Sequence, residues 1–191
     1  MLRVVIIFQI LFFSGFVSAQ ENIEVEYPFS HKRVPDSAKL IVCELFPGEK
    51  VKWIIEHNNR GDYLEAKLKV NKTRISIKFN RKGVFEDIEV EVSLSEIEEM
   101  VSNKIKSKLA NDFDRFKIKR IQYNCSGEQS EVLKFYKTGK AGLDSISKHF
   151  EIVVYGIEDK KIKSYEYIFS LNGNFLERLV NAEGNTDNLL F

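Results

Sequence analysis

Residue types that usually mark a catalytic or metal site are scarce in this 191-residue chain. Its two cysteines, Cys43 and Cys125, are too few for a disulfide-rich framework. The three histidines lie in separate segments without the spacing of a zinc site: His31, His57 and His149. The sequence also lacks a serine-elbow motif, a phosphate-binding loop and a dinucleotide-binding glycine motif. These absences favour a protein that is not an enzyme and that needs no cofactor or metal.

An excess of charge of one sign is absent as well. The chain has 29 Lys and Arg against 28 Asp and Glu. Residues 1–19 contain Arg3 and no acidic residue, so the two signs balance in the remainder. A balanced charge gives no electrostatic reason to bind nucleic acid or an anionic membrane surface. We therefore expect neither of them as a partner.

The one long apolar run lies at the N-terminus. Residues 4–17 follow the basic Arg3 and contain few polar side chains. At about 14 residues, this run is shorter than the roughly 20 that a membrane-spanning helix needs. Val17-Ser18-Ala19 supplies the small residues that a signal peptidase recognises, so we expect cleavage before Gln20. Residues 1–19 are therefore predicted to be a secretory signal peptide, and the remaining chain to be periplasmic or secreted without membrane insertion.

Aromatic and β-branched residues are abundant. The chain has 15 Phe and 7 Tyr, and much of its apolar content alternates with charged residues. This composition favours a strand-rich protein, and the alternation predicts strands with one buried face and one solvated face. Helical spacing of Ala38, Ile41, Val42 and Leu45 predicts a helix that begins after Pro35.

The remaining elements follow from the same two periodicities. Ser93 and Glu96 have the spacing of a capping box, and a helix is predicted from there to about residue 110. The predicted strands cover residues 51–55, 64–70, 75–79, 88–92, 116–123, 132–136, 150–155, 165–169 and 175–180.

A hairpin motif occurs twice. Residues 79–85 and 169–175 both read F-x-x-x-G-x-F, and each stands between two predicted strands. A glycine at the turn permits the positive φ that a tight hairpin needs. The repeat predicts an α+β fold of two similar halves, each a helix packed on an antiparallel β-meander.

These patterns divide the chain into five parts. Residues 20–33 are expected to form a polar, irregular leader that lies across the surface or stays mobile. The first half spans residues 34–110 and the second half residues 111–181. Residues 182–191 are expected to be a loose tail.

Several short motifs of the first half resemble the PepSY-like, beta-lactamase-inhibitor-protein-like exported proteins of Bacteroidetes. They occur in the family's order: Val34-Pro35, Phe46-Pro47, Trp53, Tyr63-Leu64-Glu65-Ala66 and Phe79-Asn80-Arg81-Lys82-Gly83. Asn80 replaces the family's usual aspartate, and Leu94-Ser95 replaces Leu-Pro at the second helix. The second half matches mainly through its hairpin. The resemblance implies a binding or inhibitory module of the cell envelope, and it carries over no catalytic residue.

The two cysteines leave three interpretations open. In an oxidising compartment Cys43 and Cys125 could form a disulfide that closes a long loop. They could equally be two free thiols in the core. A third interpretation pairs one thiolate with His57 or His149 as a nucleophile, although neither cysteine stands in a recognisable nucleophile context.

A basic strand carries Lys117, Lys119 and Arg120 between aromatic and apolar residues. Such a strand could follow a polyanion. The structural interpretation is preferred, in which these charges protect an edge strand from pairing with another chain.

The leading hypothesis is an exported, non-catalytic module that binds another envelope or secreted protein, inhibiting or regulating a peptidase or similar enzyme. An exposed sheet face would bury aromatic anchors inside a polar rim. The candidate binding residues are Trp53, Tyr63, Phe85, Tyr155, Tyr165 and Phe175, although Trp53 and Tyr63 fit the core as well. The alternatives are a periplasmic carrier of a small apolar ligand, held between helix and sheet, and a hydrolase that uses a cysteine.

Overall fold

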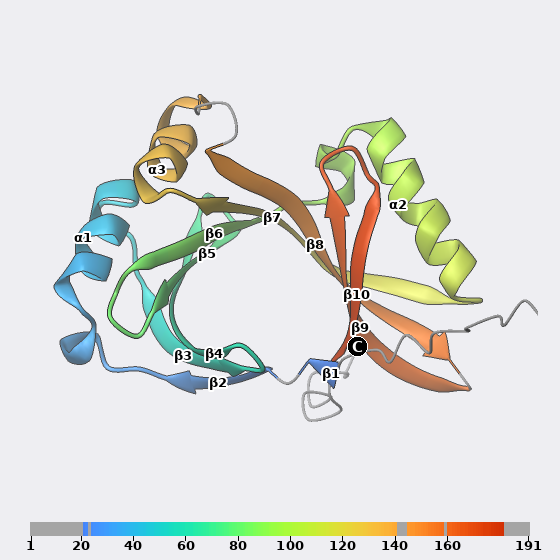
Figure 1. The fold of residues 1–191 in the computed structure, drawn as a ribbon, viewed down its shortest axis with the longest axis horizontal. Coiled ribbons are helices and arrows are strands. Elements are labelled where there is room, and N and C mark those ends of the chain that lie inside the picture. The colour runs from blue at the N-terminus through green and yellow to red at the C-terminus, as the bar shows by residue number, and fades with distance from the viewer. Residues whose placement is uncertain (1–20, 23, 141–144, 159, 182–191) are drawn as a thin grey trace, which may run out of the picture.

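The computed structural model describes residues 21–22, 24–140, 145–158 and 160–181, and these form one ten-stranded sheet with helices on one face (Figure 1). The predicted signal peptide and the predicted tail lie outside the described residues. The strand order is β1-β10-β9-β8-β7-β6-β5-β4-β3-β2. Neighbours from β2 to β10 are antiparallel, and β1 joins β10 in parallel.

The predicted α+β class is confirmed. The strands are β1 (Glu21–Asn22), β2 (Glu24–Pro28), β3 (Lys52–Asn58), β4 (Gly61–Val70), β5 (Thr73–Asn80), β6 (Phe85–Glu91), β7 (Phe116–Gly127), β8 (Ile146–Glu158), β9 (Lys161–Ser170) and β10 (Phe175–Asn181). The helices are α1 (Asp36–Leu45), α2 (Glu99–Asp112) and α3 (Gln129–Thr138), with 3-10 turns at His31–Arg33 and Leu94–Glu96. Among the described residues, no helix is both long and apolar enough to cross a membrane.

The strand predicted at residues 132–136 is wrong, because this segment is part of α3. The Glu128 side chain caps the helix by accepting hydrogen bonds from the amides of Ser130 and Glu131. Gly139 ends it with a φ of 71°, and its N–H bonds the Phe135 carbonyl. A short apolar run has no clear period, so the capping residues on either side carry the stronger signal.

The irregular leader predicted for residues 20–33 is also wrong, since β1 and β2 lie within it. β2 pairs with β3 at one end of the sheet, and β1 pairs with β10 at the other end. The N-terminal segment therefore reaches from one sheet edge to the other, which Figure 1 shows beneath the curved sheet. The polar composition fits this position, because edge strands keep one side in solvent.

The two repeated hairpins have the same hydrogen bonds. In the first, Asn80 and Val84 pair across the turn, and the Gly83 amide bonds the Asn80 carbonyl. In the β9–β10 hairpin, Ser170, Gly173 and Asn174 repeat this pattern. The φ angles of the two glycines are 80° and 76°, in the left-handed region where a side chain is strained.

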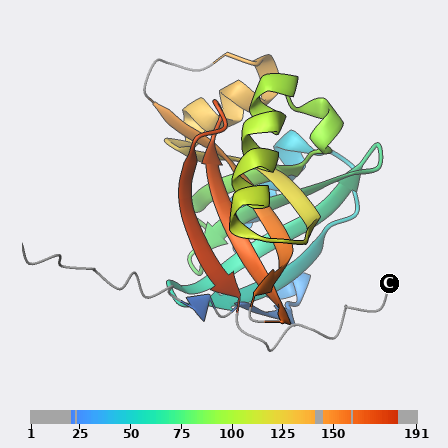
Figure 2. The same cartoon turned by 90° about the vertical axis from the view of Figure 1, so that its right-hand side faces the viewer.

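The predicted boundary between the two halves does not separate the helices according to the strands on which they pack. The apolar face of α2, which we assigned to the first half, packs with β7–β10, as Figure 2 shows from the side. α3, which follows β7, packs instead with α1 and β3–β6. Two hydrophobic clusters result, both on the same face of the sheet. The similarity of two complete halves stays a prediction.

A glycine in β8 makes room for an aromatic ring. A Cβ atom built on Gly156 would lie 2.5 Å from the ring of Phe113, a side chain that is 4% exposed. We expect Gly156→Ala to lower the free energy of unfolding by about 2 kcal/mol, because the ring has no space into which to move. Chemical denaturation measures this loss.

The control for this prediction is the same substitution in a Phe113→Ala background. Without any side chain beyond Cβ at this position, the alanine methyl group meets no ring atom, so the cost of Gly156→Ala should be clearly smaller than in the wild-type background. An equal cost in both backgrounds would refute the steric explanation.

Candidate functional site

The face of the sheet opposite the helices forms a partly open cavity of about 410 Å³. Residues from both ends of the sheet line it, including Glu24 of β2, Glu56 of β3 and Glu166 of β9. The sheet is therefore curved enough to bring distant strands around one space. β-bulges in the β5–β6, β7–β8 and β9–β10 pairs contribute, because a bulge bends its strand and increases its twist.

Charged side chains dominate the lining. Eight are carboxylates: Glu24, Glu56, Glu65, Asp87, Glu89, Glu151, Glu166 and Glu177. Five are Lys or Arg, with one histidine beside them: Arg60, Lys67, Lys78, Arg120, Lys148 and His149. A cavity of this composition is unusual, because buried charges are costly unless they are paired.

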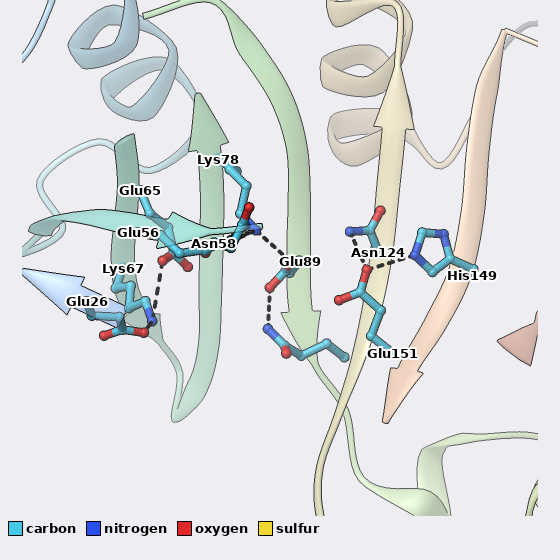
Figure 3. Close-up of polar contacts among 11 residues, drawn as sticks. Glu26, Glu56, Asn58, Glu65, Lys67, Lys78, Glu89, Asn124, His149 and Glu151 are labelled. Atoms are coloured by element: carbon cyan, nitrogen blue, oxygen red, sulfur yellow. Dashed lines mark hydrogen bonds and ion pairs between the residues drawn. The ribbon is translucent and has the colours of Figure 1, made fainter. Parts of the chain in front are cut away.

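Lys78 is the central cation of the cavity (Figure 3). Its Nζ lies 3.1 Å from Glu56 Oε2 and 3.9 Å from Glu89 Oε1. Burial alone would lower the pKa of Lys78, but the charges of Glu89 and Glu56 outweigh it and raise the pKa. Lys78 therefore stays charged and holds two buried carboxylates together.

A second group of contacts crosses β6, β7 and β8. Gln122 donates from Nε2 to Glu89, and Asn124 donates from Nδ2 to Glu151 Oε1 at 3.0 Å. His149 Nε2 lies 2.8 Å from the same Glu151 oxygen (Figure 3). Burial acts to raise the pKa of Glu151, but its hydrogen bond with His149 lowers it below the usual value.

Other carboxylates of the cavity are not fully compensated. Burial raises the pKa of Asp87 to about 7, against partial opposition from Lys78. Burial, together with the charges of Glu151 and Glu24, raises the pKa of Glu166 to about 7. Burial also raises the pKa of Glu89 and of Glu65. The cavity thus has more carboxyl groups than its own cations keep ionised at neutral pH.

Four buried polar atoms of the described chain lack a hydrogen-bond partner, and all four belong to residues that line this cavity. They are Glu65 Oε2, Asp87 Oδ1, Arg120 Nε and Asn124 Oδ1. Glu65 Oε2 still has an ion pair with Lys67 at 3.4 Å. An unsatisfied buried donor or acceptor costs about 1–3 kcal/mol and calls for an explanation. Their gathering in one cavity marks it as the candidate site.

The polar side chains of the cavity can hold a ligand through hydrogen bonds and ion pairs. Among the described residues, no three His, Cys, Asp or Glu side chains are placed to hold a metal ion. Cys43 is exposed on α1, and Cys125 is buried in the cluster on the helix side of the sheet. Neither cysteine is among the residues that line the cavity, so the cysteine-hydrolase hypothesis has no site here.

Three of the six candidate binding residues lie in the core. Trp53, Phe85 and Tyr165 are at most 6% exposed and belong to the two clusters beneath the helices. Their prediction as surface anchors is wrong. Successive side chains of a strand point to opposite faces of the sheet, and these three point to the face that the helices cover. Trp53 takes the core position that the sequence also allowed.

The other three candidates do not form one surface. Tyr63 is on the cavity side, with its ring 5.8 Å from Lys78 Nζ, and it is half-buried. Tyr155 is half-buried on β8. Phe175 is 41% exposed and packs against the rings of Tyr167 and Phe169 on the helix side. The sheet thus separates Phe175 from Tyr63.

The interpretation of the basic strand as an edge strand is wrong. β7 lies between β6 and β8, at the centre of the sheet. Arg120 contributes to the cavity, whereas Lys117 and Lys119 are exposed. The charges therefore do not protect an edge.

Both thiols are free in the structure, so the disulfide considered from the sequence is not formed. We expect iodoacetamide to alkylate Cys43 in the native protein. Cys125 should react only after unfolding, since it is 2% exposed and burial raises the pKa of its thiol. Mass spectrometry counts the adducts. A native chain that takes up no adduct and weighs two hydrogens less would contradict this prediction.

Sequence reasoning missed the cavity because it treated the polar side of each strand as a solvated face. Glu56, Glu65 and Glu89 lie on that side, yet they are only 4%, 3% and 7% exposed. A signal was present in the opposed charges of Lys78 and its neighbours, but it predicts only cross-strand pairing. Whether such a face is open or enclosed depends on sheet curvature.

The sequence matches no protein-family model and no curated protein. Solved structures are similar in fold. A predicted periplasmic protein of Bacteroides eggerthii aligns with a TM-score of 0.55 at 15% identity, over 80% of this chain and 94% of its own. A DUF2874 family protein of Bacteroides ovatus aligns with a TM-score of 0.52 at 14% identity, over 83% and 94%.

A third solved structure is a BLIP-like protein of Bacteroides fragilis. It aligns with a TM-score of 0.51 at 15% identity, over 80% of this chain and 91% of its own. At these identities the likeness concerns the fold. The resemblance to beta-lactamase-inhibitor-protein-like exported proteins of Bacteroidetes is thus confirmed as a shared fold, on which this chain carries a charged cavity.

Proposed function

We propose that this protein is an exported, non-catalytic binding protein whose binding site is the charged cavity. The observation that carries the proposal is the gathering of four unsatisfied buried polar atoms in that one space. A ligand with polar groups would complete those hydrogen bonds. The volume of about 410 Å³ lies within the range of small-molecule sites. The predicted signal peptide supports export.

The cavity lining favours a polar ligand over the apolar ligand considered from the sequence. An apolar molecule would bury charged side chains without partners, which is costly. Regulation of a peptidase through the sheet face remains a second hypothesis. It has weaker support, because Glu56, Glu65 and Gln122 are buried within the curved sheet and offer little surface to a large partner.

The test is nuclear magnetic resonance of the exported, processed protein with a library of small polar metabolites. We expect at least one compound to shift the backbone amide signals of residues in β5–β8 whose side chains line the cavity. Arg120→Met should weaken that binding at least tenfold, since it removes a donor from the lining. The matched control is Lys119→Met, one residue away and exposed.

Two outcomes would overturn the proposal. One is the absence of any binding up to millimolar concentration across the library. The other is binding that shifts only signals of the helices, or that both variants weaken equally.

A further inference from the structure

We propose that the cavity ligand is an organic cation with a primary ammonium group, bound between Asp87 on β6 and Asn124 on β7. This inference rests on the proposed function and names the ligand class of that same site. It is carried by the positions of two unsatisfied acceptors, by the excess of carboxyl groups over cations, and by the two ion pairs that already engage Lys78.

The two acceptors are neighbours across a pair of strands. In the β6–β7 register, Asp87 is opposite Ser126 and Glu89 is opposite Asn124. Asp87 and Asn124 are therefore diagonal neighbours on one face, a separation of about 7–8 Å between Cα atoms. Asp87 Oδ1 and Asn124 Oδ1 both lack a donor, and Asn124 is only 4% exposed.

An ammonium group suits this pair of oxygens. It has three N–H donors and no acceptor, so it can bond both oxygens and still reach a third. The last torsion of an Asp side chain is broad, so the Asp87 oxygen can turn toward the cavity at little cost. The Asn124 amide is held by its Nδ2 bond to Glu151, so its Oδ1 accepts from its present position. Glu89, opposite Asn124, is a candidate for the third acceptor.

The charge balance of the cavity points the same way. Eight carboxylates face five Lys and Arg side chains. Lys78 is already engaged by Glu56 and Glu89, and Lys67 by Glu26 and Glu65. An added organic cation would favour ionisation of the carboxyls that burial keeps protonated, whereas an added anion would oppose it.

Arg120 indicates what the far end of the ligand carries. Its Nε is a buried donor without a partner. Arg120 and Asn124 are four residues apart on β7, which is about 13 Å along a strand. A ligand with an ammonium group at one end and an oxygen acceptor at the other would satisfy both places.

A matched series of small compounds tests the ligand class, in which L-lysine is 1,5-diaminopentane with one added carboxylate. The probes are 1,5-diaminopentane, L-lysine, 1,5-pentanediol and glutarate, which differ in their charged or polar ends. Isothermal titration calorimetry measures the affinities, and amide shifts locate the binding. We expect the two amines to bind on β6 and β7, with lysine tighter because its carboxylate can accept from Arg120. The diol and glutarate should bind at least tenfold more weakly.

The informative variant is Asp87→Asn, with Glu91→Gln as its control. Glu91 lies on the same strand, is not part of the cavity lining, and pairs with Arg74. Asp87→Asn should weaken amine binding at least tenfold while raising the thermal midpoint, because it removes a buried charge. Mere damage to the fold would lower both, so the two readouts separate binding from structure.

Amine binding should also release protons near neutral pH, since it stabilises the ionised carboxylates. Asp87 faces charged groups on the strands around it, on its own strand and across the cavity: Glu24, Glu56, Glu65, Lys78, Glu89, Arg120, Lys148, His149, Glu151 and Glu166. Titrations in buffers of different ionisation enthalpy count the protons. We expect net release at pH 6.5 and tighter binding at pH 8.

The outcomes distinguish this inference from the proposed function. If glutarate or the diol binds the cavity more tightly than the amines, the ammonium assignment is wrong and the binding function stands. If the amines fail but another polar compound of the library binds there, the result is the same. If nothing binds the cavity, both fail together.

Discussion

Raising the pH from 5 to 8 should lower the free energy of unfolding by about 5 kcal/mol. The cause is the set of buried carboxylates whose pKa is raised in the folded protein. Asp87 and Glu166 both have a pKa of about 7, against 3.8 and 4.5 as starting values. Between these values the folded chain keeps protons that the unfolded chain has lost. Stability therefore falls as the pH rises through this window.

Other titrating groups act outside this window. Glu96, Glu128 and Glu158 have a lowered pKa because of hydrogen bonds to their carboxylates. Their stabilising contribution is present above the unfolded pKa and is lost only as the pH falls below about 4. The lysines Lys67 and Lys78 have a raised pKa, so their contribution is constant up to about pH 10.

Urea denaturation at pH 5, 6.5 and 8 measures the effect at constant ionic strength. The double variant Asp87→Asn and Glu166→Gln should flatten the dependence, because neither amide titrates. Asp36→Asn is the control, since that carboxylate is 91% exposed on the first turn of α1. A wild-type protein that is equally stable at pH 5 and pH 8 would show that the pKa of the cavity carboxyls is not raised in the folded protein.

The sequence predicted the regular elements well where a single period governs a long segment. The alternation of Leu64, Ala66 and Leu68 located β4, and the repeated glycine hairpins located two turns. It failed at α3, where a short apolar run fits either period. It also failed at β2, whose strand character comes from pairing with β3 rather than from its own residues.

The candidate site could not be predicted, for a different physical reason. Alternation shows which side chains share a face, and it placed Glu65 and Lys78 on the side away from the core. It does not show that residues of β2 and β9 meet across that face. This depends on the summed twist of ten strands and on bulges whose positions have no clear sequence mark.

Replacing the central lysine should be the most damaging single change in the cavity. Lys78→Met keeps the length of the side chain and removes its charge. Glu56 and Glu89 would then lie 4% and 7% exposed without their common cation. Removing one partner of a buried ion pair costs about 3–5 kcal/mol, because the remaining charge is left uncompensated. Thermal and urea denaturation at pH 8 measure the loss.

Arg74→Met is the matched control, on the same strand and the same face as Lys78. Its guanidinium pairs with Glu91, and the two side chains are 73% and 33% exposed. Loss of such a pair costs about 1 kcal/mol or less. An equal cost for the two substitutions would contradict the central role of Lys78.

The pH dependence of the variant separates lost charge from lost packing. If uncompensated carboxylates cause the damage, Lys78→Met should cost much less at pH 5, where Glu89 can take up a proton. Adding Glu56→Gln should restore part of the stability at pH 8, since it removes one of the two stranded charges. Lost packing would instead be independent of pH and unaffected by Glu56→Gln. Because Asp87→Asn should stabilise the same cavity that Lys78→Met destabilises, the opposite signs would together demonstrate a deficit of positive charge, which is the condition that an ammonium ligand relieves.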